Sequence, residues 1–87
     1  MSEKIVQRRK PVQVGVNATV VFDGNGTDGF LPITSGTIAI TTSQGLVILP
    51  AFPVTAGVPI PLPFHFPDNS LRGTIVAAGG ASGVLAV

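Results

Sequence analysis

The sequence of 87 residues contains no cysteine, no tryptophan and no tyrosine. Without cysteine, neither disulfides nor thiolate metal sites can support the fold, and the redox compartment cannot be inferred. A domain of this size buries only roughly 60 to 65% of the surface that its unfolded chain exposes, so its own core is thin. A partner subunit is the obvious remaining source of stability.

Charged residues are also scarce, at 10% of the chain, against about 25% in an average soluble domain. From Gly29 to the last residue only Asp68 and Arg72 carry a formal charge. A surface so poor in charge is prone to association, and we expect other chains to cover much of it. The alternative is a monomer kept in solution by its serine, threonine, asparagine and glutamine side chains.

The sequence has few groups that could carry out chemistry. His65 is the single histidine, and four scattered carboxylates offer no acid and base pair, so we expect no enzyme, no catalytic residue and no cofactor. The segment 23–29 places Asp23, Asn25 and Thr27 at alternate positions, as a calcium loop does. Its sixth position is not glycine and its twelfth is not glutamate, so we interpret it as a turn and expect no metal.

Residues 29–67 carry no charge, which raises the question of a membrane segment. This span holds seven of the eight prolines, and it lacks the roughly 20 consecutive helix-compatible apolar residues that a membrane helix requires. The start, MSEKIVQRRK, has no apolar run behind its basic residues, so the sequence predicts no secretory signal and no membrane partner.

The segment 11–22, PVQVGVNATVVF, alternates between apolar and other residues, with every even position apolar. This period of two is typical of a strand with one face against a core, and we interpret the segment as one central strand. Glycine and proline are too frequent for a long helix. The sequence therefore predicts an all-β fold, a sandwich or barrel of six to eight short strands, with residues 11–87 as a single domain.

Further strands are predicted along the rest of the chain. The run 30–33, interrupted by Pro32, suits an edge strand or a loop. The runs 36–42 and 46–49 flank Gln44-Gly45 and indicate a hairpin, whose second strand is apolar on both faces and so lies within the fold or at a subunit contact. The runs 73–78 and 84–87 flank a glycine-rich link and predict a closing hairpin, with the last strand inserted in a sheet.

Two segments are candidates for contacts with other chains. Residues 1–10 form a basic arm, which either meets acidic protein or phosphate, or is a solvated terminus. Residues 58–67, VPIPLPFHFP, form an extended strap that its prolines confine to a sheet edge. The strap either clamps a neighbouring subunit or closes the core of its own domain. The candidate contact residues are Lys4, Arg8, Arg9, Lys10, Ile60, Leu62, Phe64 and Phe66.

The second half of the chain, 51–87, carries a proline-rich strap, an Asp-Asn-Ser turn, a strand and a terminal GGASGVLAV. In this order the chain resembles small structural proteins of tailed bacteriophages, among them capsid decoration (cement) proteins. The resemblance implies a homotrimeric β module without catalytic residues, which binds between subunits of the major capsid protein on the virion surface. It is equally compatible with a neck, tail or fibre component.

Two other function classes remain open. A small β domain could recognise carbohydrate or peptide, although tryptophan and tyrosine, the usual stacking and hot-spot residues, are absent. Nucleic-acid binding through the arm is disfavoured, because the net charge is only +1 and no aromatic residue lies among the basic ones.

Overall fold

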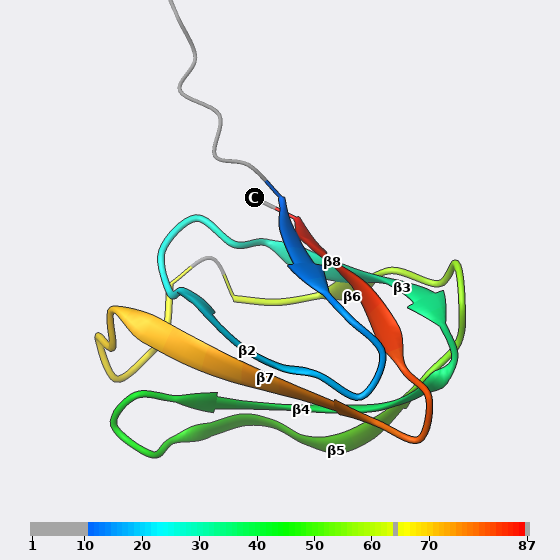
Figure 1. Cartoon of the computed structure of the whole chain (residues 1–87). Helices are drawn as coiled ribbons and strands as arrows, with labels where there is room; N and C mark the ends of the chain where they lie inside the picture. Colours follow the sequence, from blue (N-terminus) through cyan, green and yellow to red (C-terminus); the bar gives the residue numbers. More distant parts are fainter. Residues whose placement is uncertain (1–10, 64, 87) are drawn as a thin grey trace, which may run out of the picture.

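The computed structural model describes residues 11–63 and 65–86, and it shows two layers of antiparallel β-sheet (Figure 1). Sheet A has the strand order β1-β8-β3-β6 and sheet B the order β2-β7-β4-β5. The described residues form no helix, and the predicted all-β fold is confirmed. Of the two predicted architectures, sandwich and barrel, the two separate sheets show the sandwich. The strands are β1 (Val12–Val14), β2 (Thr19–Asp23), β3 (Gly29–Thr34), β4 (Gly36–Thr42), β5 (Val47–Val54), β6 (Ile60–Pro61), β7 (Arg72–Ala78) and β8 (Ser82–Ala86).

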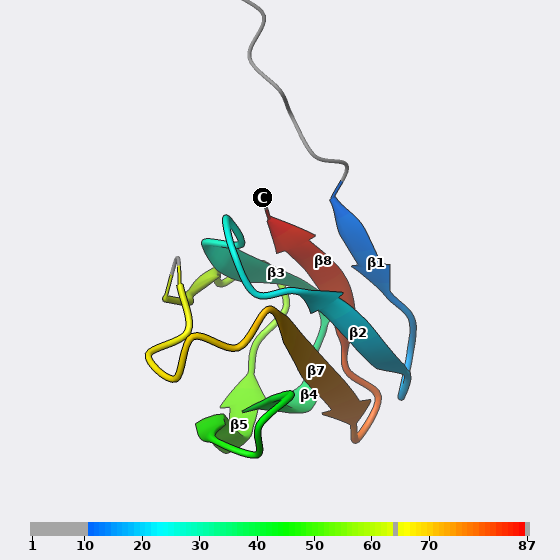
Figure 2. The same ribbon diagram turned by 90° about the vertical axis from the view of Figure 1, so that its left-hand side faces the viewer.

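The prediction of one central strand over 11–22 is wrong. The chain turns between Gly15 and Ala18, where the Ala18 N–H donates to the Gly15 carbonyl at 3.1 Å and Asn17 adopts a φ of 55°. The two halves join different sheets, each as an edge strand (Figure 2). Glycine and asparagine tolerate such a turn, and even positions still point inward on both sides of it, since Val14 and Phe22 are buried.

The closing hairpin is also not present. β7 belongs to sheet B and β8 to sheet A, so the link between them passes from one layer to the other. Gly79 and Gly80 make this passage with φ of 64° and 93°, a conformation that side chains with a Cβ rarely adopt. The last strand is inserted in a sheet as predicted, because β8 lies between β1 and β3.

The predicted hairpin around Gln44-Gly45 is confirmed as β4 and β5, although β5 extends to Val54. β5 is the edge of sheet B, so of its two predicted places the one within the fold is wrong, and a subunit contact stays a prediction. β3 is an inner strand of sheet A, not an edge. The Pro32 carbonyl accepts from the Gly57 N–H, in the loop before β6, at 2.9 Å. The carbonyl and the nitrogen of one strand residue point to the same side, so the ring nitrogen of Pro32 faces this loop and not β8. Pro32 is therefore tolerated in an inner strand, because the pairing with β8 needs no N–H from it.

The core lies between the sheets and is made of aliphatic and phenylalanine side chains from both. The Phe66 ring closes one end, where it meets Phe22 edge to face at 5.9 Å between ring centroids and 77° between planes. The buried hydrophobic residues are Val14, Phe22, Phe30, Ile38, Ile40, Val54, Phe66, Ile75, Ala77, Ala81 and Leu85.

Candidate functional site

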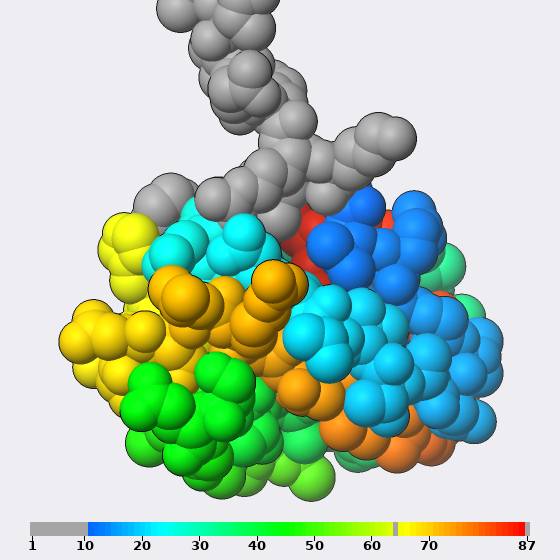
Figure 3. Space-filling view, turned by 60° about the vertical axis from the view of Figure 1, so that its left-hand side comes forward, coloured from blue at the N-terminus to red at the C-terminus, as the bar shows by residue number. Residues whose placement is uncertain are grey.

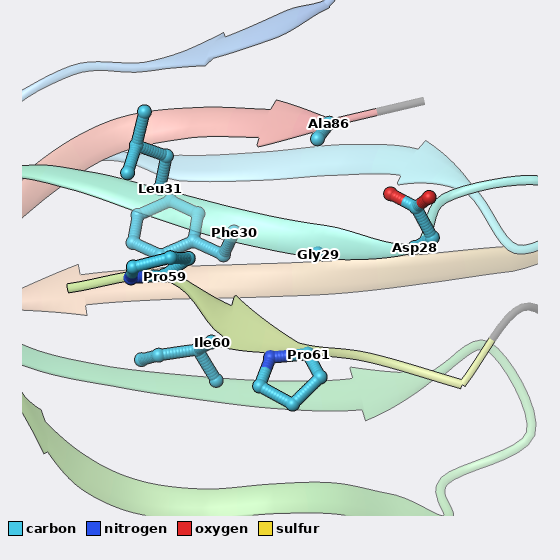
Figure 4. A pocket seen from close by; sticks show the side chains of 8 residues that line it. All are labelled: Asp28, Gly29, Phe30, Leu31, Pro59, Ile60, Pro61 and Ala86. Atoms are coloured by element: carbon cyan, nitrogen blue, oxygen red, sulfur yellow. The ribbon is translucent and has the colours of Figure 1, made fainter.

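A pocket of about 420 Å³ opens on sheet A, where β3 meets β6, and we call it the β3–β6 pocket. Figure 4 shows the side chains that surround it. They come from parts of the chain that are far apart in sequence, namely the start of β3, the strap around β6 and the end of β8. The lining residues are Asp28, Gly29, Phe30, Leu31, Pro59, Ile60, Pro61 and Ala86.

The pocket exists because β6 pairs with β3 over only two positions, Gly29 with Pro61 and Phe30 with Ile60. Gly29 contributes no side chain, and a Cβ at this position would meet the Ile60 carbonyl oxygen at 3.1 Å. The strands therefore approach closely at Gly29. Because side chains alternate along a strand, Phe30 is fully buried in the core while Leu31 remains 43% exposed on the outer side.

The walls of the pocket are almost entirely apolar. Pro61 and Ala86 flank Gly29 from opposite sides, and the carboxylate of Asp28 lies at one end (Figure 4). Among the described residues of the lining, Asp28 alone is titratable, and it is exposed. A single exposed carboxylate beside apolar walls suits recognition of an apolar group that carries a donor or a positive charge, and it supplies no acid and base pair.

The apolar surface continues beyond the pocket. Ile33 follows at the point where the pairing of β3 with β8 shifts register, and it is 57% exposed. Val84 of β8 lies directly opposite Leu31 in the sheet. We call Leu31, Ile33, Pro59, Pro61, Val84 and Ala86 the sheet A apolar surface.

The predicted contact residues of the strap turn toward this domain's own core. Ile60 and Leu62 are partly buried and pack against the core, and Phe66 is only 3% exposed. Of the two alternatives for the strap, the structure shows that it packs on and closes the core of its own domain. Contact of the strap with another subunit stays a prediction. Phe64 and the arm residues Lys4, Arg8, Arg9 and Lys10 lie outside the described residues.

Reasoning from the sequence missed the outer side of the strap. Ile60 and Leu62 face inward, so the intervening prolines face outward, and Pro59 and Pro61 become pocket walls. The alternation of proline with apolar residues was visible in the sequence. What the prolines would face was not, because Leu31 and Ala86 come from distant segments.

The remaining polar groups stabilise loops. His65 Nδ1 lies 2.8 Å from the Asn25 side-chain oxygen, and the two residues form an isolated β-bridge that ties the strap to the loop 23–29. In that loop the Thr27 hydroxyl donates to the Asp23 carbonyl at 2.9 Å. The part of the chain that the structure describes contains no cluster of three metal-ligating side chains.

Asp68 holds together the turn after the strap. Its carboxylate accepts from the Thr42 hydroxyl at 2.6 Å and from the Ser70 backbone N–H at 3.0 Å. The Thr42 hydrogen bond, followed by those from Ser70, keeps the pKa of Asp68 below its ordinary value. Asp68 thus links the turn to the β4–β5 hairpin, a structural role.

No protein-family model, curated protein or solved structure matches the chain. The described residues also contain no helix long and apolar enough to span a bilayer.

Proposed function

We propose that the chain is a non-catalytic structural subunit of a virus particle, of the capsid decoration type, which binds a shell protein through the sheet A apolar surface. The observation that carries this proposal is the β3–β6 pocket, an apolar depression within an exposed and nearly uncharged sheet face. The resemblance of residues 51–87 to small tailed-bacteriophage proteins supplies the class of assembly.

The burial of this surface supplies the binding energy. Inserting one apolar side chain fully into the pocket stabilises a complex by about 1.5 to 3 kcal/mol. Covering Leu31, which is 43% exposed, adds roughly half of that amount or less. Leu31 lies at the pocket and is the side chain that a bound partner would cover first. Asp28 at the end of the pocket selects a partner whose inserted group is followed by a donor or a cation.

The first test asks whether the chain is part of a particle. Particles assembled from the genome that encodes this chain are purified, and the copy number of the chain is measured by quantitative mass spectrometry against the shell subunit. We expect a copy number comparable with that of the shell subunit. A much lower but constant number indicates a neck, tail or fibre component, and absence from the particles contradicts the proposal.

A matched pair of variants tests the surface. Leu31→Asp places a charge at the pocket, and we expect it to reduce binding to particles that lack the chain by at least tenfold, since an unpaired buried charge is costly. Val47→Asp, on β5 of the other sheet and similarly exposed, serves as the control and retains binding. Equal binding by both variants contradicts a role of sheet A.

The pocket also favours a second candidate, a peptide-binding module, because an apolar depression of this volume ending in a carboxylate fits a short apolar segment followed by a basic residue. A capped Leu-Lys dipeptide is the probe, with nuclear magnetic resonance shifts at Leu31 and Ala86 as the readout. Saturable shifts that Leu31→Asp abolishes support this module, and unshifted resonances exclude it.

A further inference from the structure

β2 is an edge strand, and on one side its backbone groups have no strand partner among the described residues. The Ala77 N–H donates to the Ala18 carbonyl at 2.8 Å, and the Gly24 N–H donates to the Leu71 carbonyl at 2.9 Å. Residues of even number thus direct their backbone groups toward β7, since the direction alternates along a strand. Thr19 and Val21 therefore direct their N–H and carbonyl groups away from β7, where the described residues provide no further strand.

This edge is accessible and uncharged over its first positions. Val21 is 61% exposed and Thr19 is exposed as well. In the space-filling view, the segment that contains β2 (light blue to cyan) reaches the surface beside β1 and β7 (Figure 3). The open part ends at Asp23, whose carbonyl already accepts from the Thr27 hydroxyl.

The other three sheet edges carry features that discourage pairing with another chain. β5 contains Pro50 and Pro53, and its pairing with β4 shifts register twice. β6 has only two residues, the second of them Pro61. β1 has three residues and follows Pro11 directly. β2 contains no proline, no basic residue and no register shift along its five residues.

We propose that β2 pairs with β2 of a second copy of this chain, antiparallel about a two-fold axis, with Val20 opposite Val20 of the second copy. In this register Thr19 lies opposite Val21 of the second copy, so all the outward N–H and carbonyl groups of both residues are paired. This pairing is the contact by which the proposed structural subunit binds a second copy of itself, and in that respect it rests on the proposed function.

The side chains in this register are self-complementary. Val20, which packs against the core, meets its own copy on the inner face, and exposed Val21 meets Thr19 on the outer face. Asp23 lies toward the turn 15–18 of the second copy, which contains no charged residue, so no like charges are brought together. Valine and threonine pairs of this kind are favourable neighbours across strands.

A two-fold pairing joins sheet B of one copy to sheet B of the other. It uses the one sheet edge within residues 11–63 and 65–86 that carries none of the features just described. A strand of another protein could pair with the same edge. A second copy of this chain, however, is always present at the same concentration and carries a strand whose side chains match. The trimer implied by the resemblance would need a different surface. It stays a prediction, and the native mass of the chain in solution decides between the dimer and the trimer.

The absence of cysteine gives a clean crosslinking test. Residues opposite each other at a non-hydrogen-bonded antiparallel position have Cα atoms about 4.5 Å apart, which is within the range for a disulfide. We expect Val20→Cys to form a covalent dimer under mild oxidation at least tenfold faster than Val47→Cys, the control on the proline-containing edge. Equal rates for the two variants would overturn the proposed pairing.

Native mass measured by light scattering over a hundredfold concentration range is the second readout. We expect two chains for the wild type and for Val47→Lys, and one chain for Val21→Lys, whose ammonium group lies at the pairing edge. Thermal unfolding monitored by circular dichroism shows whether the Val21→Lys monomer is still folded. A folded Val21→Lys dimer, a wild-type monomer at every concentration or a wild-type trimer each overturns the two-fold pairing.

These outcomes are distinguishable from failure of the proposed function. A Val21→Lys monomer that still binds particles leaves the sheet A surface in place and separates self-contact from shell binding. A wild-type monomer that binds particles contradicts only the β2 pairing, whereas a dimer that is absent from particles contradicts only the proposed function.

Discussion

The Phe66→Ala substitution tests whether the strap closes the core of its own domain. The Phe66 ring is 3% exposed and packs edge to face on Phe22. It also lies directly on the backbone of Gly24 and Gly73, where an added Cβ would come within 2.8 Å of the ring at each. Because two glycines and a second ring shape this space, little can move to fill it, and we expect a loss of about 3 to 5 kcal/mol in unfolding free energy.

This loss is large relative to the total stability. At about 0.05 to 0.15 kcal/mol per residue, a domain of 87 residues has roughly 4 to 13 kcal/mol in total. For a domain of this size, each kcal/mol lowers the melting temperature by about 4 to 8 °C, so the variant should melt at least about 12 °C below the wild type. Urea unfolding followed by circular dichroism measures the free energy, and an unchanged denaturant slope confirms that both proteins expose the same surface.

Leu71→Ala is the matched control. Leu71 is 69% exposed and lies five residues after Phe66, so its truncation should change the unfolding free energy by less than about 0.5 kcal/mol. A Phe66→Ala loss as small as that of the control would refute closure of the core by the strap. The strap would then be kept for contact with another chain, the alternative that the sequence left open.

Alternation along the chain predicted which side chains are buried better than it predicted where strands begin and end. Val14 and Phe22 are both in the core, as the pattern required. The bend at Gly15 to Asn17 was not predicted, because the period of two continues through it with its phase unchanged. The change of sheet follows from long-range pairing, because β1 pairs with β8 in sheet A whereas β2 pairs with β7 in sheet B.

The two glycine-containing links show the same limit. The Gln44-Gly45 turn joins strands of one sheet, whereas Gly79-Gly80 joins strands of different sheets, and all three glycines have positive φ. A glycine permits either path, so local turn chemistry does not choose between them. The path after Gly79-Gly80 depends on the pairing of β8 with β1 and β3, which is a long-range property of the sandwich.

The candidate surfaces depend on topology to an even greater degree. The β3–β6 pocket joins residues from positions 28 to 86, and no local pattern brings them together. β2 has an open edge because it is the outermost strand on one side of sheet B. The sequence did indicate that such surfaces would be apolar and uncharged, since it has almost no charged residues after Gly29.

Two further substitutions test the end of the core and the turn after the strap. Gly73→Ala should cost about 1 to 3 kcal/mol in urea unfolding, because its Cβ would meet the Phe66 ring at 2.7 Å and the Phe22 ring at 2.9 Å; an unchanged midpoint would contradict this packing. Asp68→Asn tests the charged hydrogen bonds from Thr42 and Ser70. The folded protein lowers the pKa of Asp68, so this contribution is fully present above the ordinary pKa of 3.8 and is lost as the pH falls through the lower pKa of the folded state. We therefore expect the variant to be less stable than the wild type at about pH 7, with a difference that narrows at about pH 3. A difference that is equal at both pH values would mean that the ionised carboxylate is not what holds the turn.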